Sequence, residues 1–152
     1  MPALAIPLGL LALVPFVVFA AAAVGQNAAT AEHALFALID YAALVLGFAG
    51  GVHWGLALLP EAVRPSLRLA AGLLPLVVAW IALVLAQLLA PWVAVSVLAA
   101  GYLATVLTEH RAAPGLLVPA GYMWLRWAVS LVAVAMLGLV LVLRFFGQTI
   151  VF

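Results

Sequence analysis

Two side chains that could bind a ligand lie near one end of two long apolar segments. His53 follows Gly50-Gly51-Val52, and Arg126 lies in the aromatic run Tyr122-Met123-Trp124-Leu125-Arg126-Trp127. A guanidinium offers up to five donors, so a phosphate or quinone oxygen is its natural acceptor. The sequence therefore indicates a candidate pocket for an anionic or carbonyl-bearing ligand, formed by His53, Trp54, Arg126, Trp127 and Ser130.

The same residues also fit an interfacial belt, which is the interpretation that the sequence favours. Trp and Tyr concentrate at the depth of lipid head groups, and an Arg side chain can extend to that depth. In that case Arg126 points to the head groups or bonds to carbonyls at a helix end. His53 then has a satisfied hydrogen bond and no cavity beside it.

Glycines at four-residue spacing suggest a helix-packing face in the segment that carries His53. Each four-residue step turns a helix by about 400°, so such positions stay on one slowly drifting face. Small residues let a second helix approach closely, and van der Waals contact is the main attraction between helices in lipid. The sequence predicts a packing face, within the chain or against a partner, at Gly47, Gly51 and Gly55.

One carboxylate lies within a long apolar segment. A charge at membrane depth is costly unless it is paired or neutral. Asp40 and Arg144 are expected at the same depth on one side of the membrane. We therefore predict an ion pair between Asp40 and Arg144.

Several other chemistries find no support in the sequence. Cys is absent, which removes thiolate metal sites and thiol catalysis. No His-rich metal motif, phosphate loop or Ser-His-Asp arrangement is present, so we predict no metal site and no catalytic residues. The chain has no Lys and only scattered Arg, which argues against nucleic-acid binding.

The elements that carry these residues must lie in a membrane. The chain is 71% hydrophobic and 6% charged, against roughly a quarter charged in soluble domains. With ~20 residues per span, 152 residues suit an all-α bundle of five transmembrane helices in a single domain, residues 1–152. Residues 3–24 lack the basic n-region of a signal peptide, so we interpret them as the first span. The expected spans are about 3–24, 34–59, 69–89, 92–108 and 122–146.

Arginine placement predicts the orientation of this multi-pass protein. Arg64, Arg68, Arg111 and Arg126 are expected on the side of the N-terminus, and Arg144 on the other side. Cytoplasmic loops carry an excess of basic residues. We therefore expect the N-terminus in the cytoplasm (or mitochondrial matrix) and the C-terminus outside.

The segment from Tyr41 to Leu58, which includes Gly50-Gly51-Val52-His53-Trp54-Gly55, resembles a family of uncharacterised membrane proteins typified by transmembrane protein 69. Pro75 followed by Ala79-Trp80, and a proline-containing loop followed by Leu125-Arg126 and Ser130, fit the same pattern. The resemblance covers about residues 35–146. It implies a protein of the bacterial or mitochondrial inner membrane and brings no activity.

These features favour a non-enzymatic membrane protein, an accessory or assembly subunit of a larger respiratory or photosynthetic inner-membrane complex. Its expected partners are membrane lipids and another membrane protein, through the transmembrane helices. The alternative is a binding protein or enzyme for a small molecule, quinone or lipid head group, with an inner-leaflet pocket at His53 and Arg126. No cofactor is required, although a quinone, pigment or lipid remains open.

Overall fold

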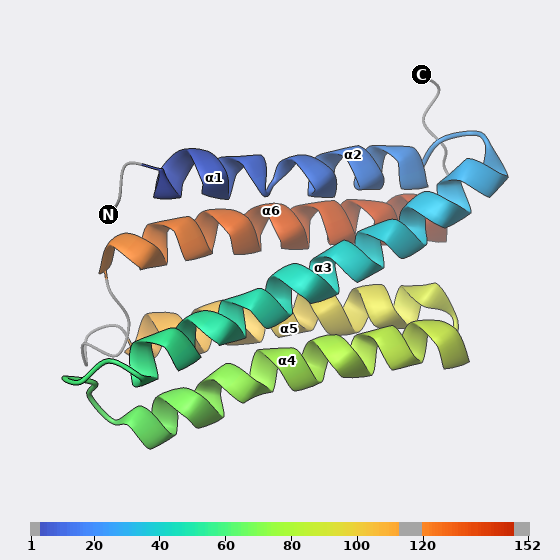
Figure 1. The fold of residues 1–152 in the computed structure, drawn as a ribbon. Helices are drawn as coiled ribbons and strands as arrows, with labels where there is room; N and C mark the ends of the chain where they lie inside the picture. Colours follow the sequence, from blue (N-terminus) through green and yellow to red (C-terminus); the bar gives the residue numbers. More distant parts are fainter. Residues whose placement is uncertain (1–3, 113–119, 148–152) are drawn as a thin grey trace.

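The computed structural model describes residues 4–112 and 120–147 as a bundle of six helices (Figure 1). The all-α fold with five long apolar helices agrees with the prediction from composition. In chain order the helices are α1 (Ala5–Leu11), α2 (Val14–Ala23), α3 (Ala28–Ala57), α4 (Pro65–Leu88), α5 (Pro91–Ala112) and α6 (Ala120–Phe145).

The first two helices form one membrane span with a break in the middle. Pro15 lies in the first turn of α2, where its missing N–H is tolerated. The break leaves the carbonyl of Ala12 outside both helices, and the hydroxyl of Tyr41 donates a hydrogen bond to it at 2.7 Å. A neighbouring helix thus supplies the donor that lipid cannot provide.

The helices form a closed ring. Each of α2, α3, α4, α5 and α6 packs against the next, and α6 returns to α2, while α3 also touches α5 across the ring. The start of α1, the α3–α4 connection, the end of α5 and the start of α6 share one end of the bundle (Figure 1). We call this the arginine-rich end, after Arg64, Arg68 and Arg126, and the other the opposite end.

α3, α4 and α5 are each longer than the sequence predicts, α3 and α5 most of all. α3 begins at Ala28 and not near residue 34, because Asn27 caps it by accepting a 3.1 Å hydrogen bond from the backbone N–H of Thr30. Its 30 residues span about 45 Å, more than the hydrocarbon core of a bilayer. α5 continues to Ala112, beyond the expected end at residue 108, which places Glu109 on a helix.

An aromatic cluster joins three helices in the core. Phe16 of α2 meets Tyr41 of α3 edge to face at a centroid distance of 5.1 Å, and Tyr102 of α5 at 6.2 Å. Tyr102 is fully buried and donates a 2.8 Å hydrogen bond to the carbonyl of Ala42. The hydroxyls of Tyr41 and Tyr102 therefore both have hydrogen-bond partners, which lowers the cost of placing them in an apolar interior.

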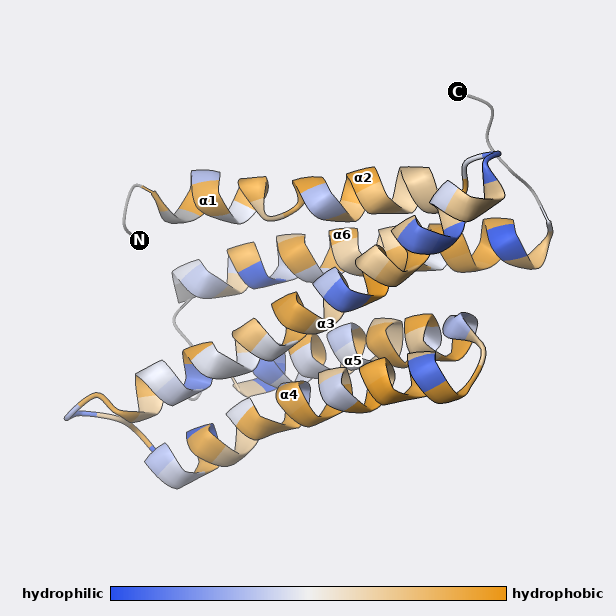
Figure 2. Ribbon diagram, turned by 45° about the vertical axis from the view of Figure 1, so that its right-hand side comes forward, coloured by the Kyte–Doolittle hydropathy of each residue, from blue (hydrophilic) through white to orange (hydrophobic). Residues whose placement is uncertain are grey.

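The outer surface is apolar along most of the bundle. Figure 2 shows hydrophobic residues in orange over much of every helix, with few hydrophilic stretches. Large side chains such as Phe48, Leu74 and Trp124 are exposed. Five helices are long and apolar enough to cross a membrane, so the chain is a multi-pass membrane protein.

The closest approach between helices is made by glycines other than those that the four-residue spacing suggests. Gly50 of α3 and Gly72 of α4 are both buried and face each other. A Cβ at Gly72 would lie 2.6 Å from the carbonyl oxygen of Gly50, and a Cβ at Gly50 would meet the carbonyl oxygen of Gly72. The backbones of α3 and α4 therefore touch directly at this point.

The predicted packing face at Gly47, Gly51 and Gly55 does not pack within the chain. Gly51 and Gly55 are exposed, and a Cβ there would meet nothing within 4 Å. Gly47 is half-buried, and its Cβ would reach only ordinary contact with the side chain of Leu76 at 3.4 Å. The buried face of α3 passes through Gly50 instead, one residue around the helix from Gly51.

We expect Gly50→Ala to destabilise the protein by about 1–3 kcal/mol, because the added methyl group would force α3 and α4 apart. Gly51→Ala is the matched control. It should change stability by less than about 0.5 kcal/mol or stabilise slightly, since Ala is the better helix former and has open space there. Unfolding of both variants in detergent checks this. Equal losses would contradict the assigned contact.

Candidate functional site

A buried carboxylate at the arginine-rich end joins three helices. Glu109 Oε1 of α5 accepts a hydrogen bond from His53 Nε2 of α3 at 3.1 Å, and Glu109 Oε2 accepts one from Arg126 Nε of α6 at 2.7 Å. The three residues are only 6%, 5% and 3% exposed, for His53, Glu109 and Arg126 respectively. Each carboxylate oxygen thus has its own donor, and the negative charge of Glu109 lies beside the guanidinium.

A second hydrogen bond fixes the guanidinium. Arg126 Nη2 donates to Thr105 Oγ1 at 2.9 Å, and Thr105 in turn donates to the carbonyl of Gly101 at 2.8 Å. Thr105 and Glu109 are four residues apart on α5, so both face α6. Arg126 is therefore held inside the bundle. It does not extend to the head groups, in contrast to the interfacial-belt interpretation.

The other residues of the predicted pocket lie apart from this cluster. Trp127 donates from Nε1 to His110 Nδ1 at 3.4 Å, which adds a second contact between α5 and α6. Trp54 is half exposed and packs over Gly72 of α4. Ser130, one turn beyond Arg126, is buried, and its hydroxyl has no partner within the described part of the chain. The structure thus brings together His53 and Arg126, through Glu109, but not Trp54 or Trp127.

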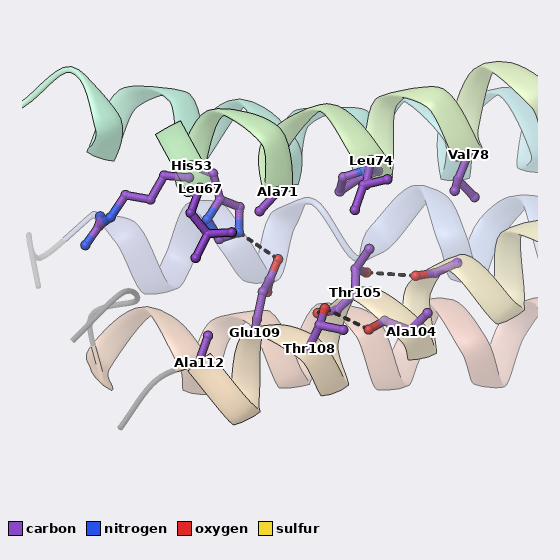
Figure 3. A pocket seen from close by; sticks show the side chains of 13 residues that line it. His53, Leu67, Ala71, Leu74, Val78, Ala104, Thr105, Thr108, Glu109 and Ala112 are labelled. Carbon is purple, nitrogen blue, oxygen red and sulfur yellow. Dashed lines mark hydrogen bonds and ion pairs between the residues drawn. The ribbon is translucent and has the colours of Figure 1, made fainter. Parts of the chain in front are cut away.

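A groove of about 380 Å³ runs beside the cluster between α4 and α5 (Figure 3). Pockets for small molecules range from roughly 300 to 1,000 Å³. The groove opens on the outer surface, because Leu67 and Leu74 on its wall are 50% and 65% exposed. His53 and Glu109 reach it, whereas Arg126 does not.

The groove is lined mainly by apolar atoms, and its few polar side chains gather toward one end. His53, Arg68, Thr105, Thr108 and Glu109 lie on the lining toward the arginine-rich end. Toward the middle of the bundle the lining changes to apolar residues of α4 and α5, among them Ala71, Leu74, Pro75, Val78 and Gly101. Figure 3 shows the labelled side chains of both helices along its length. The groove therefore has the polarity of an amphiphile, with its long direction along the helices.

A backbone acceptor and a cation also border the groove. Pro75 has no N–H, so the carbonyl of Ala71 lacks its usual helical donor. Arg68 is buried, and its Nε donates to the carbonyl of Val63 at 2.9 Å. The side chain of Arg68 therefore binds the backbone of the α3–α4 connection and also borders the groove.

The predicted ion pair between Asp40 and Arg144 is wrong. Both side chains are exposed, and among residues 4–112 and 120–147 no ion pair joins them. Asp40 lies on α3, whereas α6, which carries Arg144, packs on α2 and α5. Arg144 instead borders a groove that also includes Glu32.

The sequence interpretation missed Glu109 and Thr105 as partners of His53 and Arg126. The polar residues from Thr108 onward ended the expected helix, so Glu109 was assigned to a loop. A signal was present, since Thr105 and Glu109 have the four-residue spacing of one helix face. Within the described residues, no three His, Asp or Glu side chains gather in a way that could hold a metal ion.

We expect Glu109→Gln to destabilise the protein by about 3–5 kcal/mol, because the buried Arg126 guanidinium would lose the carboxylate that compensates its charge. Glu61→Gln is the control. Glu61 is exposed in the connection at the same end, so its substitution should cost less than about 0.5 kcal/mol. Equilibrium unfolding in detergent measures both. Similar stability of the two variants would show that the buried cluster contributes little.

Comparison with known proteins identifies a family and no closer relative of known activity. No curated protein and no solved structure matches the chain. The family described as "Protein of unknown function (DUF3429)" matches residues 1–142, which is nearly the whole chain, and the match carries no link to transmembrane protein 69. The chain belongs to the DUF3429 family.

Proposed function

We propose that this membrane protein binds a neutral amphiphile with an oxygen-bearing head group, of the quinone class, in the groove between α4 and α5. The observation that carries the proposal is the position of His53 on the lining of that groove while its Nε2 is held by Glu109. The head group would lie beside His53, and the isoprenoid tail would follow the apolar lining toward the middle of the bilayer.

The hydrogen bond to Glu109 sets what His53 can offer to a ligand. A carboxylate beside a guanidinium accepts hydrogen bonds, so Nε2 of His53 carries the proton. In the neutral ring Nδ1 is then left as an acceptor, and within the described residues it has no hydrogen-bond partner. It could accept from a quinol hydroxyl, and in the protonated ring it could donate to a quinone carbonyl.

The charges around the groove favour a neutral head group over a phosphate. Glu109 borders the groove, so a phosphate there would meet a like charge in a medium of low dielectric constant. The guanidinium of Arg126 already pairs with the carboxylate of Glu109, and Arg68 already donates to the carbonyl of Val63. Thr105 and Thr108 add hydroxyl groups to the lining without adding charge.

Membrane placement remains part of the proposal. The positive-inside rule supports the cytoplasmic or matrix side for the arginine-rich end, which puts the polar end of the groove near the inner leaflet. The resemblance to the family typified by transmembrane protein 69 supports a bacterial or mitochondrial inner membrane. Both statements follow from the sequence and are tested by reporter fusions and by fractionation.

The role of an accessory or assembly subunit stays a prediction. The exposed face of α3 at Gly51 and Gly55 leaves room for a helix of another chain, but nothing in the described residues identifies such a partner. Purification in mild detergent tests this role directly, because a stoichiometric partner would co-migrate with the protein. A bound amphiphile without a partner would favour the groove alone.

A short-chain benzoquinone is a suitable probe of the groove. We expect it to raise the unfolding temperature of the protein in detergent, since a ligand that binds only the folded state stabilises it. Ala104→Phe should abolish the rise, because Ala104 lines the groove and a phenyl ring would fill it. Ala100→Phe is the matched control: Ala100 is exposed one turn earlier on α5 and does not line the groove, so the rise should remain.

A second variant tests the polar end. His53→Phe should weaken quinone binding by about tenfold, which corresponds to the loss of one hydrogen bond. Equal shifts in the Ala104→Phe and Ala100→Phe variants, or no shift in the unmodified protein, would contradict quinone binding in this groove.

A further inference from the structure

A second groove, of about 880 Å³, lies at the opposite end of the bundle. It is formed by the first part of α3, the start of α5 and the last turns of α6. It lies a bundle length away from His53 and shares no lining residue with the first groove. Its charged and aromatic lining residues are Glu32, Trp92, Arg144, Phe145 and Phe146.

The two charges on this groove are opposite and do not neutralise each other. Glu32 and Arg144 both line it and both are exposed, yet no ion pair within the described residues joins them. A ligand with a single charge would pair with only one of these two side chains. A ligand that carries both a phosphate and an ammonium group offers a partner to each.

The surroundings of Arg144 favour the anionic part of such a ligand. α5 begins at Pro91 on the same groove, so the positive end of its helix dipole lies there. A guanidinium binds a phosphate through two parallel hydrogen bonds. Arg144 and the start of α5 therefore form the side of the groove that attracts a phosphate.

The remaining lining suits an ammonium group and acyl chains at the membrane surface. Glu32, which lies on α3, supplies a carboxylate for the ammonium group. Trp92, in the first turn of α5, is 62% exposed. Leu35, Val95 and Val140 make the wall apolar toward the middle of the bundle. Trp is a residue typical of the interface between head groups and hydrocarbon.

From this arrangement we propose that the groove at the opposite end binds a phospholipid with a primary ammonium head group, phosphatidylethanolamine. Arg144 binds the phosphate, and Glu32 accepts hydrogen bonds from the ammonium group. A primary ammonium donates three hydrogen bonds, whereas a trimethylated one donates none. The site therefore distinguishes phosphatidylethanolamine from phosphatidylcholine, although both are zwitterions. It also distinguishes it from phosphatidylglycerol, which has no cation for Glu32.

Native mass spectrometry of the full-length protein in detergent tests this, with the three phospholipids matched in their acyl chains. We expect phosphatidylethanolamine to bind about tenfold more tightly than either of the others, as the loss of one charge-assisted hydrogen bond implies. Glu32→Gln should remove the preference over phosphatidylglycerol, and Arg144→Gln should weaken all three lipids. Glu61→Gln, an exposed substitution at the arginine-rich end, is the control and should keep the preference.

Equal binding of the three lipids by the unmodified protein would overturn the proposal without any variant. A preference that survives in Glu32→Gln would also overturn it, because the ammonium group would then be recognised elsewhere. Tighter binding of phosphatidylglycerol would show a purely cationic site. None of these outcomes bears on quinone binding, since the two grooves share no residue.

Discussion

The arginine-rich end depends on the hydrogen bonds that the buried carboxylate of Glu109 accepts. It receives one donor from α3 and one from α6 while it lies on α5, so three helices meet at a single side chain. Glu109 and Arg126 are both buried, so either charge without its partner would cost several kcal/mol. The same carboxylate binds the ring of His53 through Nε2, and His53 lies on the lining of the groove. If the groove binds a ligand as proposed, stability and ligand binding at this end are coupled through one residue.

Most other polar groups in the described part of the bundle also find partners inside the protein, and the buried hydroxyl of Ser130 is an exception. The hydroxyl of Tyr41 serves the carbonyl freed at the break of the first span, and Tyr102 bonds to the backbone of α3. Where no polar groups need partners, close packing replaces them, as in the contact of Gly50 with Gly72. The groove between α4 and α5 departs from this pattern. Pro75 removes a donor there and Thr108 brings a hydroxyl to the surface, which is what a bound polar group could use.

The sequence predicts the five-span architecture, but it does not predict Glu109 and Thr105 as the partners of His53 and Arg126. Composition and span length predict five helices, because lipid demands long apolar segments. Glu109 was misplaced because a run of polar residues resembles a loop until its buried partners are known. The glycine face was assigned to Gly51 when the buried position is Gly50, because glycine spacing does not reveal which face meets a neighbour. Asp40 was expected at the depth of Arg144 because the expected span began near residue 34. α3 begins at Ala28, and Arg144 borders the same groove as Glu32, eight residues before Asp40.

The central claim, that Glu109 links His53 and Arg126, is tested most directly by a triple-mutant cycle. His53 and Arg126 are joined in the structure through this carboxylate, so unfolding free energies of His53→Gln, Arg126→Gln and the double variant should be non-additive. Repeated in the Glu109→Gln background, the same pair should become additive to within about 0.5 kcal/mol. Additive losses in the unmodified background, or a coupling that persists without the carboxylate, would contradict the account.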